Sequence, residues 1–443
     1  MSPTFSALHI RNYRIYAAGA VISNTGTWMQ RVAQDWLVLL LSAGSGTALG
    51  ITTGLQFLPA LLLSPLAGVV ADRYPKQRVL LCTQVAMVVP AAVLGVLAIT
   101  GLATTEWVYA LALLLGVGSA FDAPARQSFV VEMVGPDDLA NAVGLNSASF
   151  NAARVVGPAL AGVLIAAGGS DVTATGWVIL ANALSYLAVV WSLTRLRIAD
   201  LQPATPMERG RGAVREGVRY VRSRPDLMLI LAVVFFAGTF GLNFQMTSAL
   251  MATEEYGKGA SEYGLLGSVM AVGSLAGALL AARRSKPSLR LVVGAGIAFA
   301  LVEIAAGFMP TYFWFALWVP LVGLTALTMI TAANATMQLS VDPQMRGRVA
   351  ALYLMIFMGG TPLGSPFIGW LGEMFGAPWT LIGGGLITLV GVLGSVAAYV
   401  WMQGVDLRLL SRRGAYRVRD AGDALEQEQK AEEATAPTGA SAA

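Results

Sequence analysis

The chain has 443 residues, of which 56% are hydrophobic and only 12% are charged. A soluble protein carries about twice that share of charges, so a set of ordinary soluble domains is excluded. Uncharged stretches of about 20 residues recur, and each can cross the roughly 30 Å hydrocarbon core of a bilayer as a helix. The composition therefore predicts an all-α, multi-pass membrane protein.

Twelve apolar stretches are predicted to be transmembrane helices. Prolines within them are tolerable because neighbouring helices satisfy the freed backbone groups. No secretory cleavage signal precedes the first stretch, so we expect that span to be retained. In chain order the spans cover residues 13–41, 48–71, 79–101, 106–125, 140–168, 174–194, 227–250, 261–282, 289–309, 312–335, 349–372 and 377–403.

The basic residues predict the orientation. Of the 29 lysines and arginines, all fall on one side of the predicted spans except Lys258, which falls on the other, and Arg31 and Arg154, which fall inside spans. Positive loops remain in the cytoplasm. We therefore expect a plasma-membrane protein with both termini cytoplasmic, and we attribute the net charge of +4 to topology and not to nucleic-acid binding.

A long polar stretch divides the chain near its middle. We expect an N-terminal six-helix bundle at 1–194, a cytoplasmic linker at 195–226, a C-terminal six-helix bundle at 227–403 and a disordered polar tail at 404–443. The halves echo each other: LAGVVADR at 66–73 resembles LAGALLAARR at 275–284. Two pseudo-symmetric bundles are typical of transporters whose site lies between the halves.

The linker contains a candidate amphipathic helix, AVREGVRYVRSR. A helical register places its valines on one face, with arginines beside them, which is the pattern of a helix lying on a membrane surface. A solvated linker helix fits the same pattern. The residues concerned are Val214, Val218, Val221, Arg215, Arg219 and Arg222.

Several motifs resemble those of the major facilitator superfamily. FDAPARQSFVVEMV at 121–134, RVVGP at 154–158 and MRGRV at 345–349 are similar to the twelve-span drug-exporter branch, which includes the bacterial enterobactin exporter and macrolide efflux pumps. The resemblance extends over about residues 8–403. It implies a twelve-span helical exporter.

Two sets of residues follow from this resemblance. The first is the loop between spans two and three, a cytoplasmic gate motif: Gly68, Asp72, Arg73, Lys76 and Arg78. The second is the span-five signature of antiporters, expected to pack helices together: Gly157, Pro158 and Gly162.

The charges of the gate motif also indicate a function without reference to the family. Cations are favourable at the end of one helix and an anion at the start of the next. Asp72 can bond to a cation or to helix-terminal N–H groups when the cytoplasmic ends pack together, which would make the loop a latch. The alternative is that the cluster only fixes topology.

Ionisable groups within spans are costly and usually functional. Asp35 and Arg31 are four residues apart in span one, and so share a helical face; Arg154 lies in span five and Glu303 in span nine. A proton-coupled exporter needs a carboxyl that changes protonation between two conformations. Asp35 is the first candidate and Glu303 the second. The alternative for Asp35 is a permanent pair with an arginine.

A substrate cavity needs polar groups mixed with aromatic and soft apolar surface. Membrane helices also use amides only to bond to each other. The candidates are Asn24, Trp28, Gln30, Gln56, Phe57, Asn146, Asn151, Asn243, Gln245 and Met246.

No nucleotide-binding loop or catalytic motif is visible, and the lone His9 argues against a histidine metal site or a catalytic triad. We therefore predict no enzyme, no metal and no cofactor, but a monomeric exporter of hydrophobic or amphipathic small molecules (drugs, antibiotics or siderophore-like metabolites) driven by proton antiport. A lipid flippase or uptake permease on the same fold is one alternative. A transport-inactive membrane sensor or assembly partner is another.

Overall fold

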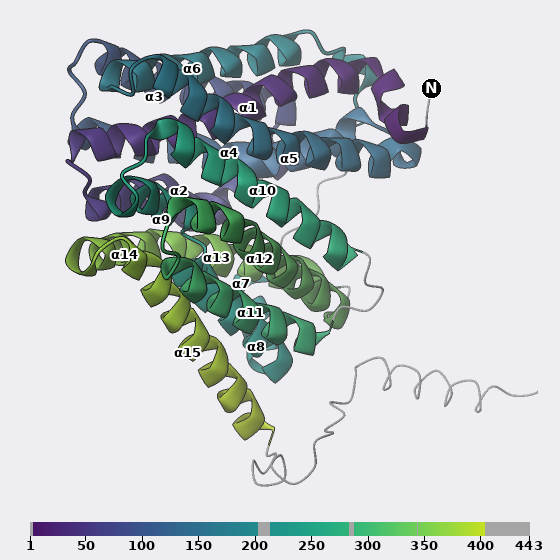
Figure 1. The fold of residues 1–443 in the computed structure, drawn as a ribbon. Helices are drawn as coiled ribbons and strands as arrows, with labels where there is room; N and C mark the ends of the chain where they lie inside the picture. The colour runs from purple at the N-terminus through teal and green to yellow at the C-terminus, as the bar shows by residue number, and fades with distance from the viewer. Residues whose placement is uncertain (1–2, 203–212, 283–287, 343, 404–443) are drawn as a thin grey trace, which may run out of the picture.

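A computed structural model describes residues 3–202, 213–282, 288–342 and 344–403 (Figure 1). Within these ranges the regular elements are all helical, so the predicted all-α fold is confirmed. The principal helices are α1 Arg11–Leu41, α2 Gly46–Arg73, α3 Lys76–Ile99, α4 Thr105–Met133, α5 Pro136–Ala167, α6 Val172–Thr194, α7 Ala213–Arg222, α8 Pro225–Phe236, α9 Phe244–Leu250, α10 Ala260–Ala282, α11 Leu289–Gly307, α12 Tyr312–Ser340, α13 Arg346–Gly359, α14 Thr361–Phe375 and α15 Pro378–Met402.

Short turns complete the element order. A 3-10 segment, η1 Pro3–His9, precedes α1, and another, η2 Ile198–Asp200, follows α6. The π turns η3 Ala237–Gly241 and η4 Met251–Glu255 interrupt and end the helix that starts with α8. The helices α13 and α14 likewise form one bent span.

Eleven segments among the described residues are long and apolar enough to cross a membrane. The polar first helix α1 is not one of them, although its 31 residues give it sufficient length. The multi-pass membrane fold is therefore confirmed, and the full count of twelve spans stays a prediction.

The helices form two bundles, α1–α6 and α8–α15, which occupy the upper and lower parts of Figure 1. We call the end of the molecule that holds η1 and α7 the linker face, and the end that holds the loops after α1 and α5 the opposite face. The bundles meet mainly where α2 packs on α14 and α5 packs on α10.

The linker helix α7 packs on α13 of the C-terminal bundle. Val221 is buried, the Tyr220 hydroxyl donates to Asp342 at 3.0 Å, and Arg348 pairs with Glu216 at 3.0 Å. These contacts fix α7 to protein, which neither the membrane-surface reading nor the solvated reading anticipated. The predicted tail at 404–443 lies outside the described residues.

Candidate functional site

The contact between α2 and α14 is built from glycines and small residues. A side chain at Gly50 would collide with the backbone of Ser365, and one at Gly46 with the carbonyl of Gly369. The Ser365 hydroxyl donates to the Gly50 carbonyl at 3.0 Å. Small residues allow close approach of membrane helices, so this contact holds the two bundles backbone to backbone.

The predicted span-five signature forms part of the second contact. Pro158 and Gly162 of α5 face Gly264 of α10. A side chain at Gly264 would collide with the Pro158 carbonyl. The Ala159 amide donates to the Ser268 hydroxyl across the same contact at 3.1 Å. Gly157 lies against Trp28 of α1 instead, so it joins helices within the N-terminal bundle.

Asp35 is the central polar residue between the bundles. It is 6% exposed, and its Oδ2 atom accepts hydrogen bonds from Gln245 Nε2 at 2.6 Å and from the Tyr263 hydroxyl at 2.7 Å. Both donors belong to the C-terminal bundle, and the Tyr263 ring stacks on Trp36 beside Asp35. One carboxyl of α1 is therefore bonded only to the other bundle among the described residues.

The alternative of a permanent Arg31–Asp35 pair is not what the structure contains. No ion pair between them is formed at 4.0 Å or less within the described residues, and Asp35 is engaged by Gln245 and Tyr263. The four-residue spacing along α1 places Arg31 and Asp35 on one face of the helix. The Asp35 carboxylate nevertheless accepts its hydrogen bonds from an amide and a hydroxyl of the other bundle.

Glu373 provides a second carboxyl bond across the interface. From the end of α14, its Oε2 atom accepts from the Ser45 hydroxyl at 3.1 Å and from the Thr47 amide at 3.2 Å. These groups form the N-terminus of α2, where a negative charge is favourable. Sequence reasoning missed Glu373 and Tyr263 because no pattern along the chain connects them with α1 or α2.

Two arginines of the N-terminal bundle lie on one indole ring. The Arg31 guanidinium carbon is 4.7 Å from the centroid of Trp28, and that of Arg154 is 5.6 Å from the same centroid. Arg31 also lies 5.6 Å from the centroid of Phe57. Within the described part of the chain, neither guanidinium has an ion pair at 4.0 Å or less or a hydrogen-bond partner, although Asp35 attracts Arg31 from a longer distance. The buried Nε of Arg31 and Nε1 of Trp28 are unsatisfied.

This arrangement has an electrostatic cost. The two ring distances bound the separation of the guanidinium carbons at about 10 Å. At that separation and an effective dielectric constant of about 20, two like charges repel by about 1.7 kcal/mol, and more if they are closer. The pair therefore favours any anion that comes to lie between them.

Glu303 is 1% exposed and faces Gly241 at the π turn of the C-terminal bundle. Its Oε2 atom has no hydrogen-bond partner among the described residues. A bare carboxylate in such a place is costly, so the surroundings favour the neutral acid. Unlike Asp35, it has no hydrogen bond or ion pair to the other bundle among the described residues.

The remaining cavity candidates are dispersed. Asn182 donates to Gln30 within the N-terminal bundle, and Gln34 donates to Gln56 at 3.3 Å. Asn151 bonds to its own helix, and Asn243 closes the break after η3 by donating to the Thr239 carbonyl at 2.9 Å. Met246 is buried in the core, whereas Asn24 and Asn146 are half-buried.

The gate motif lies at the linker face. Lys76 pairs with Glu132 of α4 at 2.6 Å, inside its own bundle. Gly68 is buried, Asp72 is half-buried, and Arg73 and Arg78 are exposed. The latch between bundles stays a prediction.

A further buried ion pair escaped the sequence reasoning. Asp122 is 6% exposed and pairs with Arg126 at 2.8 Å, while its other oxygen accepts from Thr83 at 2.9 Å and Gln84 at 2.7 Å. Its position near the end of a span suggests a surface residue, but the helix α4 continues well past the predicted end of the span. The pair is thus structural and lies within the N-terminal bundle.

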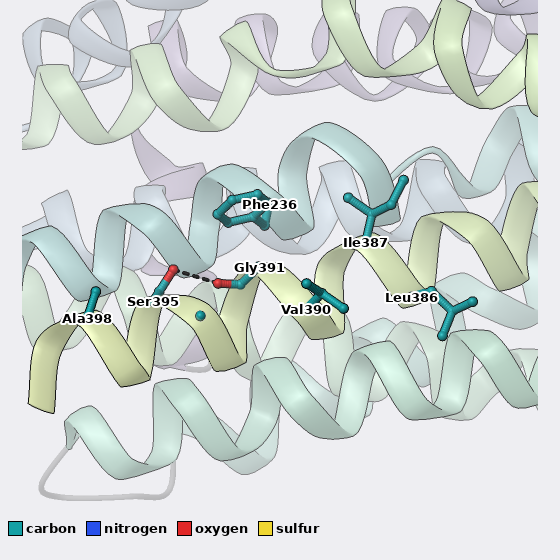
Figure 2. Close-up of a pocket in the computed structure, with 8 residues that line it drawn as sticks. Phe236, Leu386, Ile387, Val390, Gly391, Ser395 and Ala398 are labelled. Atoms are coloured by element: carbon teal, nitrogen blue, oxygen red, sulfur yellow. Dashed lines mark hydrogen bonds between the residues drawn. The ribbon is translucent and has the colours of Figure 1, made fainter. Parts of the chain in front are cut away.

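Two grooves mark the outer surfaces of the bundles and not the interface. One, of about 540 Å³, runs along α15 beside Phe236 (Figure 2). The other, of about 590 Å³, lies between α3 and α4 near Cys82. Their linings are mostly apolar and contain none of the interface residues, so we attribute them to lipid-facing packing.

A family model described as transmembrane secretion effector matches residues 2–408. The multidrug efflux pump Tap of Mycolicibacterium fortuitum is 28% identical over 86% of this chain and 93% of its own length. The staphyloferrin A transporter of Staphylococcus aureus is 32% identical, but over only 37% of this chain and 40% of its own length.

Solved structures resemble the whole fold. A bacterial homologue of the human lysosomal transporter Spinster, in an inward-facing and unoccupied conformation, has a TM-score of 0.66 at 16% identity and covers 88% of this chain and 97% of its own. A D-xylose–proton symporter has a TM-score of 0.68 at 12% identity, covering 86% and 96%. At these identities the likeness concerns the fold alone.

Proposed function

Because the chain belongs to the transmembrane secretion effector family of the major facilitator superfamily, we propose that it exports hydrophobic or amphipathic small molecules across the plasma membrane by alternating access, driven by proton antiport. Family and fold indicate a membrane transporter and not an enzyme. The efflux-pump relatives support the export direction. On this proposal the linker face is cytoplasmic, as the basic residues predict.

The bonding of Asp35 is the observation that carries the proposal. Its two donors, Gln245 and Tyr263, belong to the C-terminal bundle, so on this proposal they are its partners only while the bundles are closed at the opposite face. Hydrogen bonds to the ionised form stabilise that form. Closure therefore changes both the hydrogen bonding and the hydration of Asp35, and its protonation is linked to the conformation.

This linkage allows proton antiport. When the opposite face is open, Asp35 takes a proton from outside. After the bundles close there, the proton leaves toward the cytoplasm. The hydrogen bonds of Gln245 and Tyr263 to Asp35 then hold the opposite face closed until substrate binding supplies the free energy to reopen it.

The test is transport by protein reconstituted in vesicles with an imposed pH gradient, using a panel of amphipathic fluorescent dyes. We expect the native protein to move dye in the direction opposite to the proton flow. We expect dye transport by the variant Asp35→Asn to lose its dependence on the pH gradient. The variant Glu106→Gln, at an exposed carboxyl at the start of α4, is the matched control. Full pH dependence in Asp35→Asn would remove Asp35 from coupling, and uptake in place of export would reverse the direction.

A further inference from the structure

We propose that the substrates are amphipathic organic anions, whose carboxylate-type group lies between Arg31 and Arg154 while the apolar body packs on Trp28, Phe57 and Phe150. The inference rests on the proposed transport function and names its substrate class. Four contacts carry it: both guanidinium–Trp28 distances, the Arg31–Phe57 distance, and the edge contact of Phe150 with Trp28 at 5.8 Å.

The charge of the cluster is unbalanced. Among the residues that the structure describes, neither arginine has an ion-pair or hydrogen-bond partner, and the buried Nε of Arg31 has no acceptor. A guanidinium can only donate hydrogen bonds and keeps its charge. Asp35, the acid nearest along α1, is bonded to Gln245 and Tyr263 and attracts Arg31 only from beyond ion-pair distance, so one carboxylate faces two guanidinium groups. An anion satisfies both arginines, whereas a cationic or neutral amphiphile leaves them unpaired.

The cluster faces the interface between the bundles. Trp28, Arg31 and Asp35 follow one another at three- and four-residue spacing, so they share one face of α1. Asp35 shows that this face is directed at the C-terminal bundle. Phe57 and Arg154 come from α2 and α5, the helices that make the two main contacts between bundles.

Depth separates this cluster from a lipid-headgroup site. Arg31 lies ten residues before the end of α1, or about 15 Å along the helix axis. That is about half the thickness of the hydrocarbon core, too deep for an arginine that only reaches toward headgroups. An anion that meets it must travel through the protein.

The aromatic rings define the rest of the ligand. Phe150 is 47% exposed although it lies in the middle of α5, and with Trp28 and Phe57 it provides three rings around the arginines. Planar guanidinium groups suit carboxylate geometry. The matching ligand therefore carries one anionic end and one apolar, preferably aromatic, end.

The experiment measures equilibrium binding of three pyrene probes to the full-length protein in lipid nanodiscs. They are 4-(pyren-1-yl)butanoate, its neutral amide and the corresponding butylamine, which differ only in the charged end. We expect the carboxylate to bind about tenfold or more tightly than the amide, and the amine to bind most weakly. Equal or tighter binding of the amide or amine would overturn the proposal.

Variants assign the preference to the two arginines. Arg31→Gln combined with Arg154→Gln should abolish the carboxylate preference. Arg195→Gln, which removes a surface arginine that also lies 5.6 Å from a tryptophan ring, Trp191, should retain it. Survival of the preference in the double glutamine variant would refute the site.

If the double glutamine variant does not fold, Arg31→Lys with Arg154→Lys decides the matter. It keeps both charges but loses the planar donors, so the carboxylate preference should fall without vanishing; an unchanged preference refutes the site.

The substrate-class proposal and the export proposal can be refuted independently of each other. Dye uptake would overturn the export function while a carboxylate preference stands, and export of the amide as fast as the butanoate would overturn only the substrate class.

Discussion

Gly50→Ala tests whether the α2–α14 contact is a moving seam. The added methyl group would meet the Ser365 carbonyl and the backbone of Pro366 in the other bundle. Neither atom belongs to a flexible side chain, so the bundles must separate locally. Overpacking of this kind costs about 1–3 kcal/mol, paid only in the conformation that is closed at the opposite face.

That cost converts directly into a population. Each 1.4 kcal/mol changes a two-state ratio tenfold, so we expect the closed-to-open ratio to fall by about 5- to 150-fold. Spin labels at Thr104 and Lys258, which are exposed on the opposite face of the two bundles, report it as a longer distance by pulsed electron paramagnetic resonance. The exposed native Cys82 is first replaced by serine.

Gly144→Ala is the matched control, because a methyl group there meets nothing within 4 Å. It should leave the distance distribution unchanged. If Gly50→Ala also leaves it unchanged while the protein remains folded, the seam does not open during the cycle, and the linkage argued for Asp35 fails with it.

Two further predictions concern buried charges. Asp122→Asn should lower the free energy of unfolding by about 3–5 kcal/mol, because Arg126 then remains buried without its carboxylate; denaturant unfolding in detergent measures this, and an unchanged midpoint would contradict it. Glu303→Gln should leave the melting temperature unchanged or raised, because the carboxyl has no partner to lose among the described residues, and should keep pH-driven transport; loss of the pH dependence would make Glu303 the proton carrier in place of Asp35.

The fold was predictable because its signals are local. Apolar runs of sufficient length and the spacing of Arg31 and Asp35 act within one helix, and the arginines that set the orientation lie in the loops beside each helix. Even the interruption of the seventh span at Ala237–Gly241 depends on neighbours: a side chain at Gly241 would meet Phe299 and Glu303. No local pattern announces such a break, because its stabilising contacts come from distant helices.

The partners in the site were not predictable for the same reason. Gln245 and Tyr263 lie 210 and 228 residues from Asp35 along the chain. Position along α1 makes Arg31 the natural partner of Asp35, yet an amide and a hydroxyl of the other bundle bond the carboxylate. Arg31 thereby has no ion pair within 4.0 Å among the described residues, which sequence spacing alone could not indicate.

The lack of a direct bond between Arg31 and Asp35 lets each group respond to a partner of its own. A permanent Arg31–Asp35 pair would neutralise the charges but would respond neither to a proton nor to an anion. Asp35 is bonded across the bundles and Arg31 is directed at Trp28. On the proposed mechanism each charge is neutralised reversibly, the acid by a proton and the arginines by an anionic substrate. On this mechanism, a proton entering and an anion leaving both move charge in the direction that an inside-negative membrane favours, at about 2.3 kcal/mol per charge for each 100 mV. The cost of the unpaired arginines in the empty protein is thus offset when substrate binds, which makes binding and reopening of the outer face parts of one step.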